Sequence, residues 1–114
     1  MEEINPFNSL RAIEKYAPLY ARAKMDRTQI ADFMKSKLAI LYNESDGKTV
    51  EDRKNYALSH PEYLELIKGH SKAVEEEEIY KHKLKNAELA ISVYQTMSAN
   101  SRLEARSIDV ADRN

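Results

Sequence analysis

A chain of 114 residues with a net charge of −1 is short enough for one domain and nearly neutral overall. It holds 2 glycines, 3 prolines and no cysteine, which argues against an all-β fold and excludes disulfides, thiolate zinc sites and thiol chemistry. Residues that favour helix dominate its composition. We therefore expect an all-α protein, a long helical hairpin with short flanking helices, forming one domain over residues 1–114.

The first helix is predicted to begin at Asn5 and Pro6, because asparagine is a good N-cap and proline suits the first helical turn. It should run to about Tyr16. Pro18 disfavours helix in the residue before it, so we expect a break or kink there. A second helix should then continue from Pro18 to about Glu44.

A polar segment at residues 43–47 ends in Asp-Gly and predicts a loop. Thr49 and Asp52 have the spacing of a capping box, which predicts a short helix from Val50 to Leu58. His60 precedes a proline and is expected to help cap the helix that follows.

The last helix is predicted to run from about Pro61 to about Arg106, with a frayed tail from about residue 107. Its apolar residues follow the alternating three- and four-residue spacing of a coiled coil, which predicts a homo-oligomer. The expected oligomer interface is Leu84, Ala87, Ile91 and Tyr94, continued by Ser98, with Leu64, Ile67 and Val74 as its earlier part.

No catalytic pattern is visible: the chain has no phosphate loop, no nucleophile elbow and no zinc-ligand spacing. We therefore expect a protein that is not an enzyme and that needs no cofactor or metal. The run Glu75–Glu78 is interpreted as a solvated charged face, since four successive helical residues point in four directions.

Charge is distributed unevenly along the chain. Residues 10–38 carry a net charge of +4, residues 39–80 a net charge of −5, and residues 81–107 a net charge of +3. A hairpin is expected to bring the two basic segments to one end and leave the acidic middle at the other. Such a basic end is typical of a protein that binds a polyanion.

Tyr16 and Tyr20 lie among basic residues, and interleaved cations and aromatic rings are what single-stranded nucleic acid binds: cations follow the phosphates and rings stack on bases. The alternative from these residues is an ordinary amphipathic helix with solvated lysines.

Three segments together resemble the small UvsY-like recombination mediators of phages, over about residues 20–106. They are a basic helix ending in FMKSKLAILYNESDG, the linking segment TVEDRKNYALSHPEY, and the long helix LELIKGHSKAVEEEEIYKHKLKNAELAISVYQTMSANSR. The resemblance implies a ring-forming, non-catalytic protein that binds single-stranded DNA and loads a recombinase onto strands coated by a single-strand-binding protein. It implies DNA contacts at Arg22, Lys24, Arg27, Lys35 and Lys37, with Arg102 and Arg106 at the same end.

Two other functions fit the same pattern: a phage protein that binds and inhibits a host protein through its acidic end, and a small virion assembly or connector protein. The first residues lack the apolar core of a secretory signal, and no apolar run approaches the ~20 residues that span a bilayer. We therefore expect no membrane partner and a location in the host cytoplasm.

Overall fold

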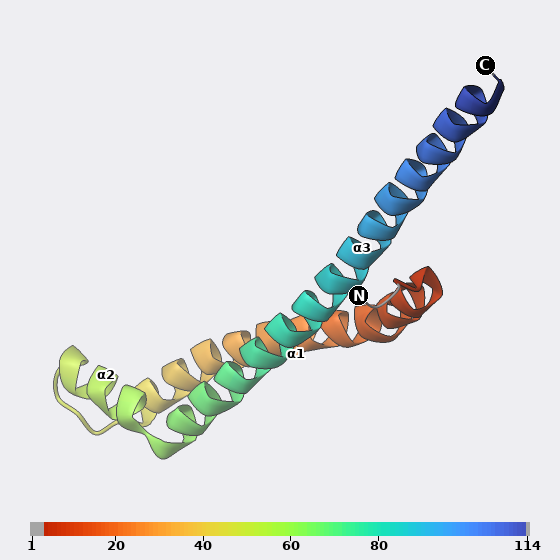
Figure 1. Cartoon of the computed structure of the whole chain (residues 1–114). Coiled ribbons are helices and arrows are strands. Elements are labelled where there is room, and N and C mark those ends of the chain that lie inside the picture. The colour runs from red at the N-terminus through yellow and green to blue at the C-terminus, as the bar shows by residue number, and fades with distance from the viewer. Residues whose placement is uncertain (1–3, 114) are drawn as a thin grey trace. The chain divides into compact units, whose positions relative to one another are not determined.

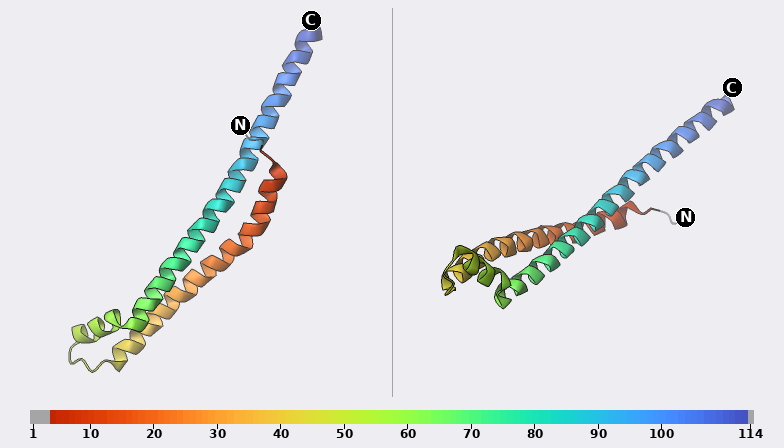
Figure 2. Two further views of the ribbon diagram at one scale, coloured as in Figure 1. Left: turned by 60° about the horizontal axis from the view of Figure 1, so that its bottom comes forward. Right: turned by 90° about the vertical axis from the view of Figure 1, so that its left-hand side faces the viewer.

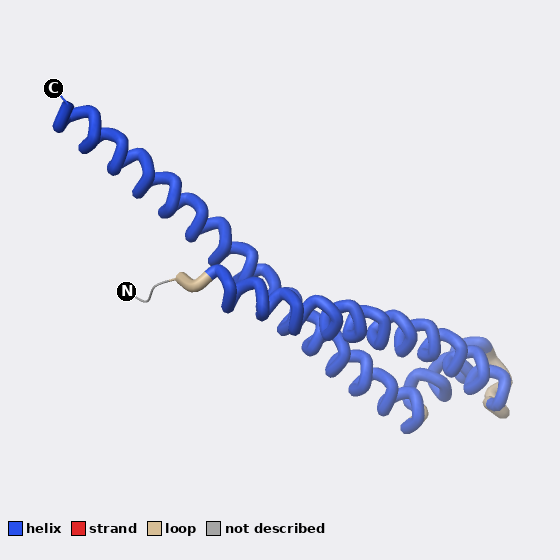
Figure 3. Tube along the Cα trace, turned by 90° about the vertical axis from the view of Figure 1, so that its right-hand side faces the viewer, coloured by secondary structure: helices blue, strands red, loops and turns tan. Residues whose placement is uncertain are grey.

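The computed structural model describes the backbone of residues 4–113 and the side chains of residues 4–109. This part of the chain forms three helices and no strand (Figures 1 and 3). The helices are α1 (Pro6–Glu44), α2 (Val50–Ser59) and α3 (Pro61–Arg113). The predicted all-α class, with one long helix pair and one short helix, is confirmed.

Helix α1 begins as expected, because the Asn5 side-chain oxygen accepts hydrogen bonds from the backbone N–H groups of Phe7 (2.9 Å) and Asn8 (3.4 Å). Of the two outcomes predicted at Pro18, the break is wrong, since α1 continues through this residue, and the kink stays a prediction. Pro18 is exposed, so the carbonyl of Glu14 that loses its helical partner lies on the solvent side, where water can satisfy it.

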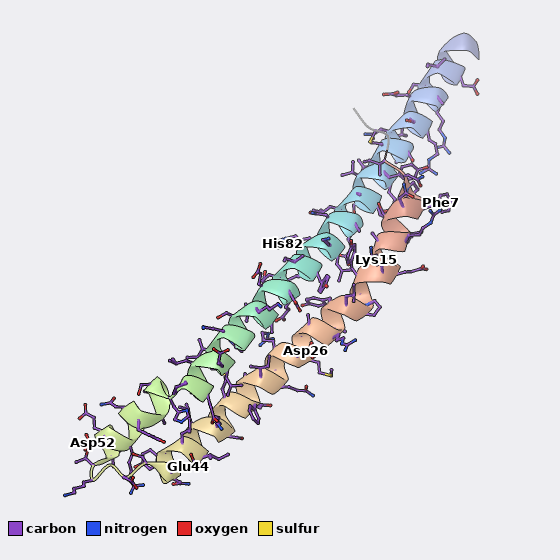
Figure 4. All side chains as sticks on the ribbon, turned by 90° about the horizontal axis from the view of Figure 1, so that it is seen from below. Phe7, Lys15, Asp26, Glu44, Asp52 and His82 are labelled. Carbon is purple, nitrogen blue, oxygen red and sulfur yellow. The ribbon has the colours of Figure 1, made fainter. Side chains whose placement is uncertain are left out.

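Helix α2 is fastened to the end of α1. The Thr49 hydroxyl accepts a hydrogen bond from the backbone N–H of Asp52 at 3.0 Å, which confirms the predicted N-cap. Arg53 donates from Nε to the Gly47 carbonyl at 3.0 Å and from Nη1 to the Tyr42 carbonyl at 3.3 Å. These two bonds satisfy the Tyr42 carbonyl at the end of α1 and the Gly47 carbonyl in the loop. Figure 4 labels Glu44 and Asp52 on the two sides of this loop.

Helix α3 begins with the expected histidine cap, since His60 Nδ1 accepts a hydrogen bond from the backbone N–H of Glu62 at 3.1 Å. The predicted end near Arg106 is too early, because α3 continues to Arg113. The last residue of the predicted frayed tail, Asn114, lies outside the described residues.

The chain divides into two compact units, and α1 and α3 contribute to both. The terminal unit is formed by Met1–Ala17 with Lys81–Asn114, and the central unit by Pro18–Tyr80. In the central unit, the orange-to-yellow stretch of α1 runs antiparallel beside the green stretch of α3, with α2 between their ends (Figures 1 and 2). The terminal unit pairs the red start of α1 with the later part of α3. The expected single domain stays a prediction.

The core is thin and made largely of alanine. The fully buried apolar residues of the central unit are Ala23, Leu41, Ala57 and Ala73, and Ala87 is buried in the terminal unit. Small side chains let two helix backbones approach closely, but each one removes little apolar area from water. Specific polar contacts between the helices therefore contribute strongly to the way in which the helices pair.

The buried stripe of α3 differs from the predicted one in its first half. Leu64 and Ile67, expected in the seam, are 45% and 39% exposed. Counting back from Leu84 in alternating steps of four and three leads to a different face, which contains a glutamate. Its residues, all buried or partly buried, are Tyr63, Leu66, His70, Ala73, Glu77 and Tyr80.

Candidate nucleic-acid interface

The nine residues predicted to contact DNA are divided between the two units. Tyr16, Arg102 and Arg106 belong to the terminal unit. The central unit holds the other six, which are Tyr20, Arg22, Lys24, Arg27, Lys35 and Lys37. The structure therefore places these nine residues on two separate compact bodies.

Two of the five basic residues in this central-unit set are neutralised by carboxylates of α3. Arg27 forms a two-point ion pair with Glu77, through Nε to Oε2 and through Nη2 to Oε1 at 3.3 Å. Lys37 Nζ lies 2.5 Å from Glu62 Oε2. Antiparallel pairing sets the basic stretch of α1 against the acidic stretch of α3, so the expected separation of a basic end from an acidic end is wrong within this unit.

The ion pairs shift the pKa values of Arg27, Lys37 and Glu62. The hydrogen bond and charge of Glu77 raise the pKa of the Arg27 guanidinium above its ordinary value. The hydrogen bond from Lys37 lowers the pKa of the Glu62 carboxyl, and the same bond raises the pKa of Lys37. Arg27, Lys37 and Glu62 are accordingly charged at neutral pH, and each has its ion-pair partner within the chain.

Glu77 corrects the interpretation of Glu75–Glu78 as a uniformly solvated face. It is only 9% exposed, whereas Glu75, Glu76 and Glu78 are exposed. The four residues do point in four directions, and one of these directions is the seam between α1 and α3. The signal was present in the sequence, because position 77 continues the alternating spacing of Leu84, Ala87 and Ile91.

The terminal unit contains a cluster in which two lysines from different helices approach one tyrosine ring. Lys83 of α3 donates from Nζ to the Tyr16 hydroxyl at 3.3 Å, and the same nitrogen lies 4.7 Å from the ring centroid. The Lys15 ammonium lies 5.3 Å from that centroid. These distances are within the range of cation–π attraction. We call Lys15, Tyr16 and Lys83 the lysine–tyrosine cluster; Figure 4 labels Lys15 on α1.

Positive charge dominates around this cluster. The hydrogen bond from Lys83 is the main cause that lowers the pKa of the Tyr16 phenol, followed by the positive charge of Lys15. The paired stretches 4–17 and 81–90 contain five basic residues and two acidic ones. The five basic residues are Arg11, Lys15, Lys81, Lys83 and Lys85.

Tyr16 was predicted from the sequence as a contact residue, but Lys83 was not singled out. The two residues are 67 positions apart, and only the pairing of α1 with α3 brings them together. The signal that could have found Lys83 is the hairpin itself, since the basic start of α1 must face some part of the basic segment at 81–85.

The remaining predicted contacts are exposed or partly exposed. Arg22, Lys24 and Lys35 are exposed on α1, and Tyr20 is partly buried. On α3, Arg102 and Arg106 are exposed and line one shallow hollow with Ala99 and Leu103. They form a second basic surface in the terminal unit.

The predicted oligomer interface is partly used within the chain. Ala87 is buried, and Leu84 and Ile91 are partly buried, so these residues pack in the helix pair of the terminal unit. Tyr94 is exposed. A separate stripe of α3 at four-residue spacing is about half exposed, and it consists of Leu89, Val93 and Met97.

A hollow of about 360 Å³ lies between α1 and α2 of the central unit. Its lining is almost wholly apolar and includes no carboxylate, histidine or hydroxyl nucleophile other than the Tyr42 phenol. The lining residues are Leu38, Ala39, Tyr42, Lys54, Ala57 and Leu58.

Among the described residues, no three histidine or carboxylate side chains come together as metal ligands, and no helix is long and apolar enough to cross a membrane. Comparison of the chain with models of protein families, with curated proteins and with solved structures finds no match.

Proposed function

We propose that this protein is a non-enzymatic accessory factor that binds single-stranded DNA through the terminal unit. The observation that carries the proposal is the lysine–tyrosine cluster: two ammonium groups, contributed by two helices, converge on one accessible aromatic side chain. Cations beside an aromatic ring are the elements with which proteins hold a flexible strand without reading its sequence.

The cluster favours contact with the phosphate backbone over base stacking at Tyr16. An ammonium already lies over the ring at 4.7 Å, so a stacking base must displace it or use the other face. The Tyr16 hydroxyl and ring hold Lys83 in place, which reduces the side-chain entropy lost when the ammonium meets a phosphate. Arg11, Lys81 and Lys85 add positive charge along the same helix pair.

Recombinase loading is the finer form of the proposal, and it rests on the resemblance to UvsY-like mediators. Its partners are a recombinase and a single-strand-binding protein, and its site is the host cytoplasm. One terminal unit offers few phosphate contacts, so useful affinity requires several chains acting together. The exposed stripe Leu89, Val93 and Met97 supports self-association, including a ring.

Fluorescence anisotropy of a labelled oligothymidine, titrated with the protein at several salt concentrations, tests the proposal. We expect binding that weakens steeply with salt, and weaker binding to a duplex of the same length. Each phosphate contact on a single strand adds about 0.7 to the slope of log affinity against log salt. No binding at low salt contradicts the proposal.

A second candidate function is binding to a host protein, and the apolar hollow of the central unit favours it. Leu58 lines the hollow and is about half exposed, and Val50 and Tyr56 are exposed on the same short helix. Apolar surface of this kind is typical of protein contacts. Co-purification of one host protein that is lost on Leu58→Asp, with oligonucleotide binding absent from the start, supports this alternative. The virion assembly role stays a third possibility without an observation of its own.

A further inference from the structure

We infer that the Arg27–Glu77 ion pair is a register lock, which restricts α1 and α3 of the central unit to one longitudinal alignment. The inference does not depend on nucleic-acid binding. It rests on the position of the pair inside the helix seam and on the small size of Ala23 and Ala73, the buried apolar residues one turn from Arg27 and Glu77.

The alanines of the seam distinguish poorly between registers. Ala23 of α1 and Ala73 of α3 are buried, and alanine fits opposite most partners at close helix separation. A displacement of one helix by seven residues returns the same face to the seam, because the spacing repeats every heptad. The apolar packing next to the ion pair therefore favours the observed alignment only weakly over its neighbours.

The ion pair distinguishes the observed alignment from the alignments one heptad away. Sliding by one heptad in one direction sets Arg27 against His70 and Glu77 against Tyr20. The opposite slide sets Glu77 against Met34. Each alternative leaves a carboxylate that is 9% exposed without its guanidinium partner, which is strongly unfavourable. The two-point geometry adds directionality, because both Arg27 nitrogens must reach both carboxylate oxygens.

The second cross-helix ion pair cannot replace the first. Lys37 meets Glu62, but the Glu62 side chain is 61% exposed. If α1 slides along α3, the Lys37 ammonium and the Glu62 carboxylate return to water at little cost in free energy. This pair therefore forms in the observed alignment but does not select it. Figure 4 labels Asp26, which precedes Arg27, on the stretch of α1 concerned.

The test measures the alignment directly by spin-label distances. The chain has no cysteine, so Gln29→Cys and Lys72→Cys introduce the only two attachment sites. Both side chains are exposed and border the same hollow between α1 and α3. The labelled chain is diluted with unlabelled chain, so that distances between molecules do not contribute.

With Arg27 and Glu77 intact, we expect one narrow distance. In the variant Arg27→Met with Glu77→Leu, we expect unchanged helix content and at least one further distance population, since a heptad slide displaces the labels by about 10 Å along the axis. If this variant fails to fold, Arg27→Gln with Glu77→Gln provides the same comparison. A single, unchanged distance in the folded neutral variant overturns the inference.

The matched control removes the ion pair between Glu65 and Lys68, which are both exposed on α3 and three residues apart. Glu65→Leu with Lys68→Met should leave one narrow distance. If this control also gains a second population, the effect is a general loosening and the register lock is refuted.

Discussion

Lys83 and Tyr16 meet across 67 residues of sequence, with the ammonium donating to the phenol oxygen at 3.3 Å. The contact pairs the start of α1 with α3 inside the terminal unit. It also places a cation where a nucleic-acid phosphate can reach it. The functional proposal therefore depends on how the two helices pair.

Removing the Tyr16 ring should weaken oligonucleotide binding. Tyr16→Ala deletes the surface on which Lys15 and Lys83 rest, and a cation–π contact at an exposed site contributes about 0.5–1 kcal/mol. Tyr16→Phe keeps the ring and loses only the hydroxyl, so its effect should be smaller. Anisotropy titrations of both variants provide the comparison. Equal affinity for wild type and Tyr16→Ala excludes a role for the ring.

The two glycines should respond to alanine in opposite ways. At Gly47 an added Cβ would lie 2.9 Å from Asp52 Cβ and 3.2 Å from the Arg53 backbone nitrogen, so Gly47→Ala should destabilise the central unit by about 1–3 kcal/mol. At Gly69, inside α3, an added Cβ meets nothing within 4 Å. Gly69→Ala should therefore stabilise the helix by about 1 kcal/mol.

Denaturant unfolding monitored by circular dichroism measures both changes, and each glycine variant is the control for the other. A destabilising Gly69→Ala contradicts the open environment seen at this position. A neutral Gly47→Ala contradicts the tight loop between α1 and α2.

The Lys37–Glu62 pair should make stability depend on pH in a defined direction. In the folded protein the pKa of Glu62 lies below its ordinary value of 4.5. The contribution of Glu62 to the free energy of unfolding is therefore present above pH 4.5 and is lost as the pH falls through the folded-state pKa. The raised pKa of Lys37 gives a contribution that is present below 10.5 and is lost as the pH rises through the folded pKa.

Comparison of wild type with Glu62→Gln isolates this effect. The difference in unfolding free energy should be greatest between about pH 5 and pH 10 and should shrink in acid. A difference that stays constant from pH 7 down to pH 2 is incompatible with the ion pair.

Substitutions at different positions of α3 should affect self-association and folding separately. Val93→Glu places a charge on the exposed stripe, and we expect it to reduce the mass measured by light scattering while leaving helix content unchanged. Ile91→Asp is the contrasting variant, because Ile91 is partly buried within the terminal unit and its replacement should also lower stability. A wild-type mass equal to one chain at micromolar concentration refutes self-association.

Local sequence signals predicted much of the fold. The caps at Asn5, Thr49 and His60 involve partners within three residues, so they could be found from short motifs. The helical class followed from composition and spacing. The break predicted at Pro18 was wrong because a long helix tolerates a proline on its exposed side, while the alternative kink stays a prediction.

The candidate site was predicted less well, because it depends on contacts between distant residues. Tyr16 was predicted from its basic neighbours, but Lys83 and the partners of Arg27 and Lys37 follow from the antiparallel alignment of α1 with α3. That alignment involves separations of 50 residues for Arg27 with Glu77 and 67 for Tyr16 with Lys83. A charge count along the chain cannot show which charges neutralise each other.

The salt dependence of single-stranded DNA binding in the variant Lys15→Gln with Lys83→Gln tests the central proposal most directly. The matched control, Lys68→Gln with Lys72→Gln, removes the same charge from exposed positions of the central unit. We predict that the first variant binds more weakly and loses about 1.4 from the salt slope, at ~0.7 for each phosphate contact, while the control changes the slope little. Equal losses in the two variants, or none in the first, contradict binding through the lysine–tyrosine cluster.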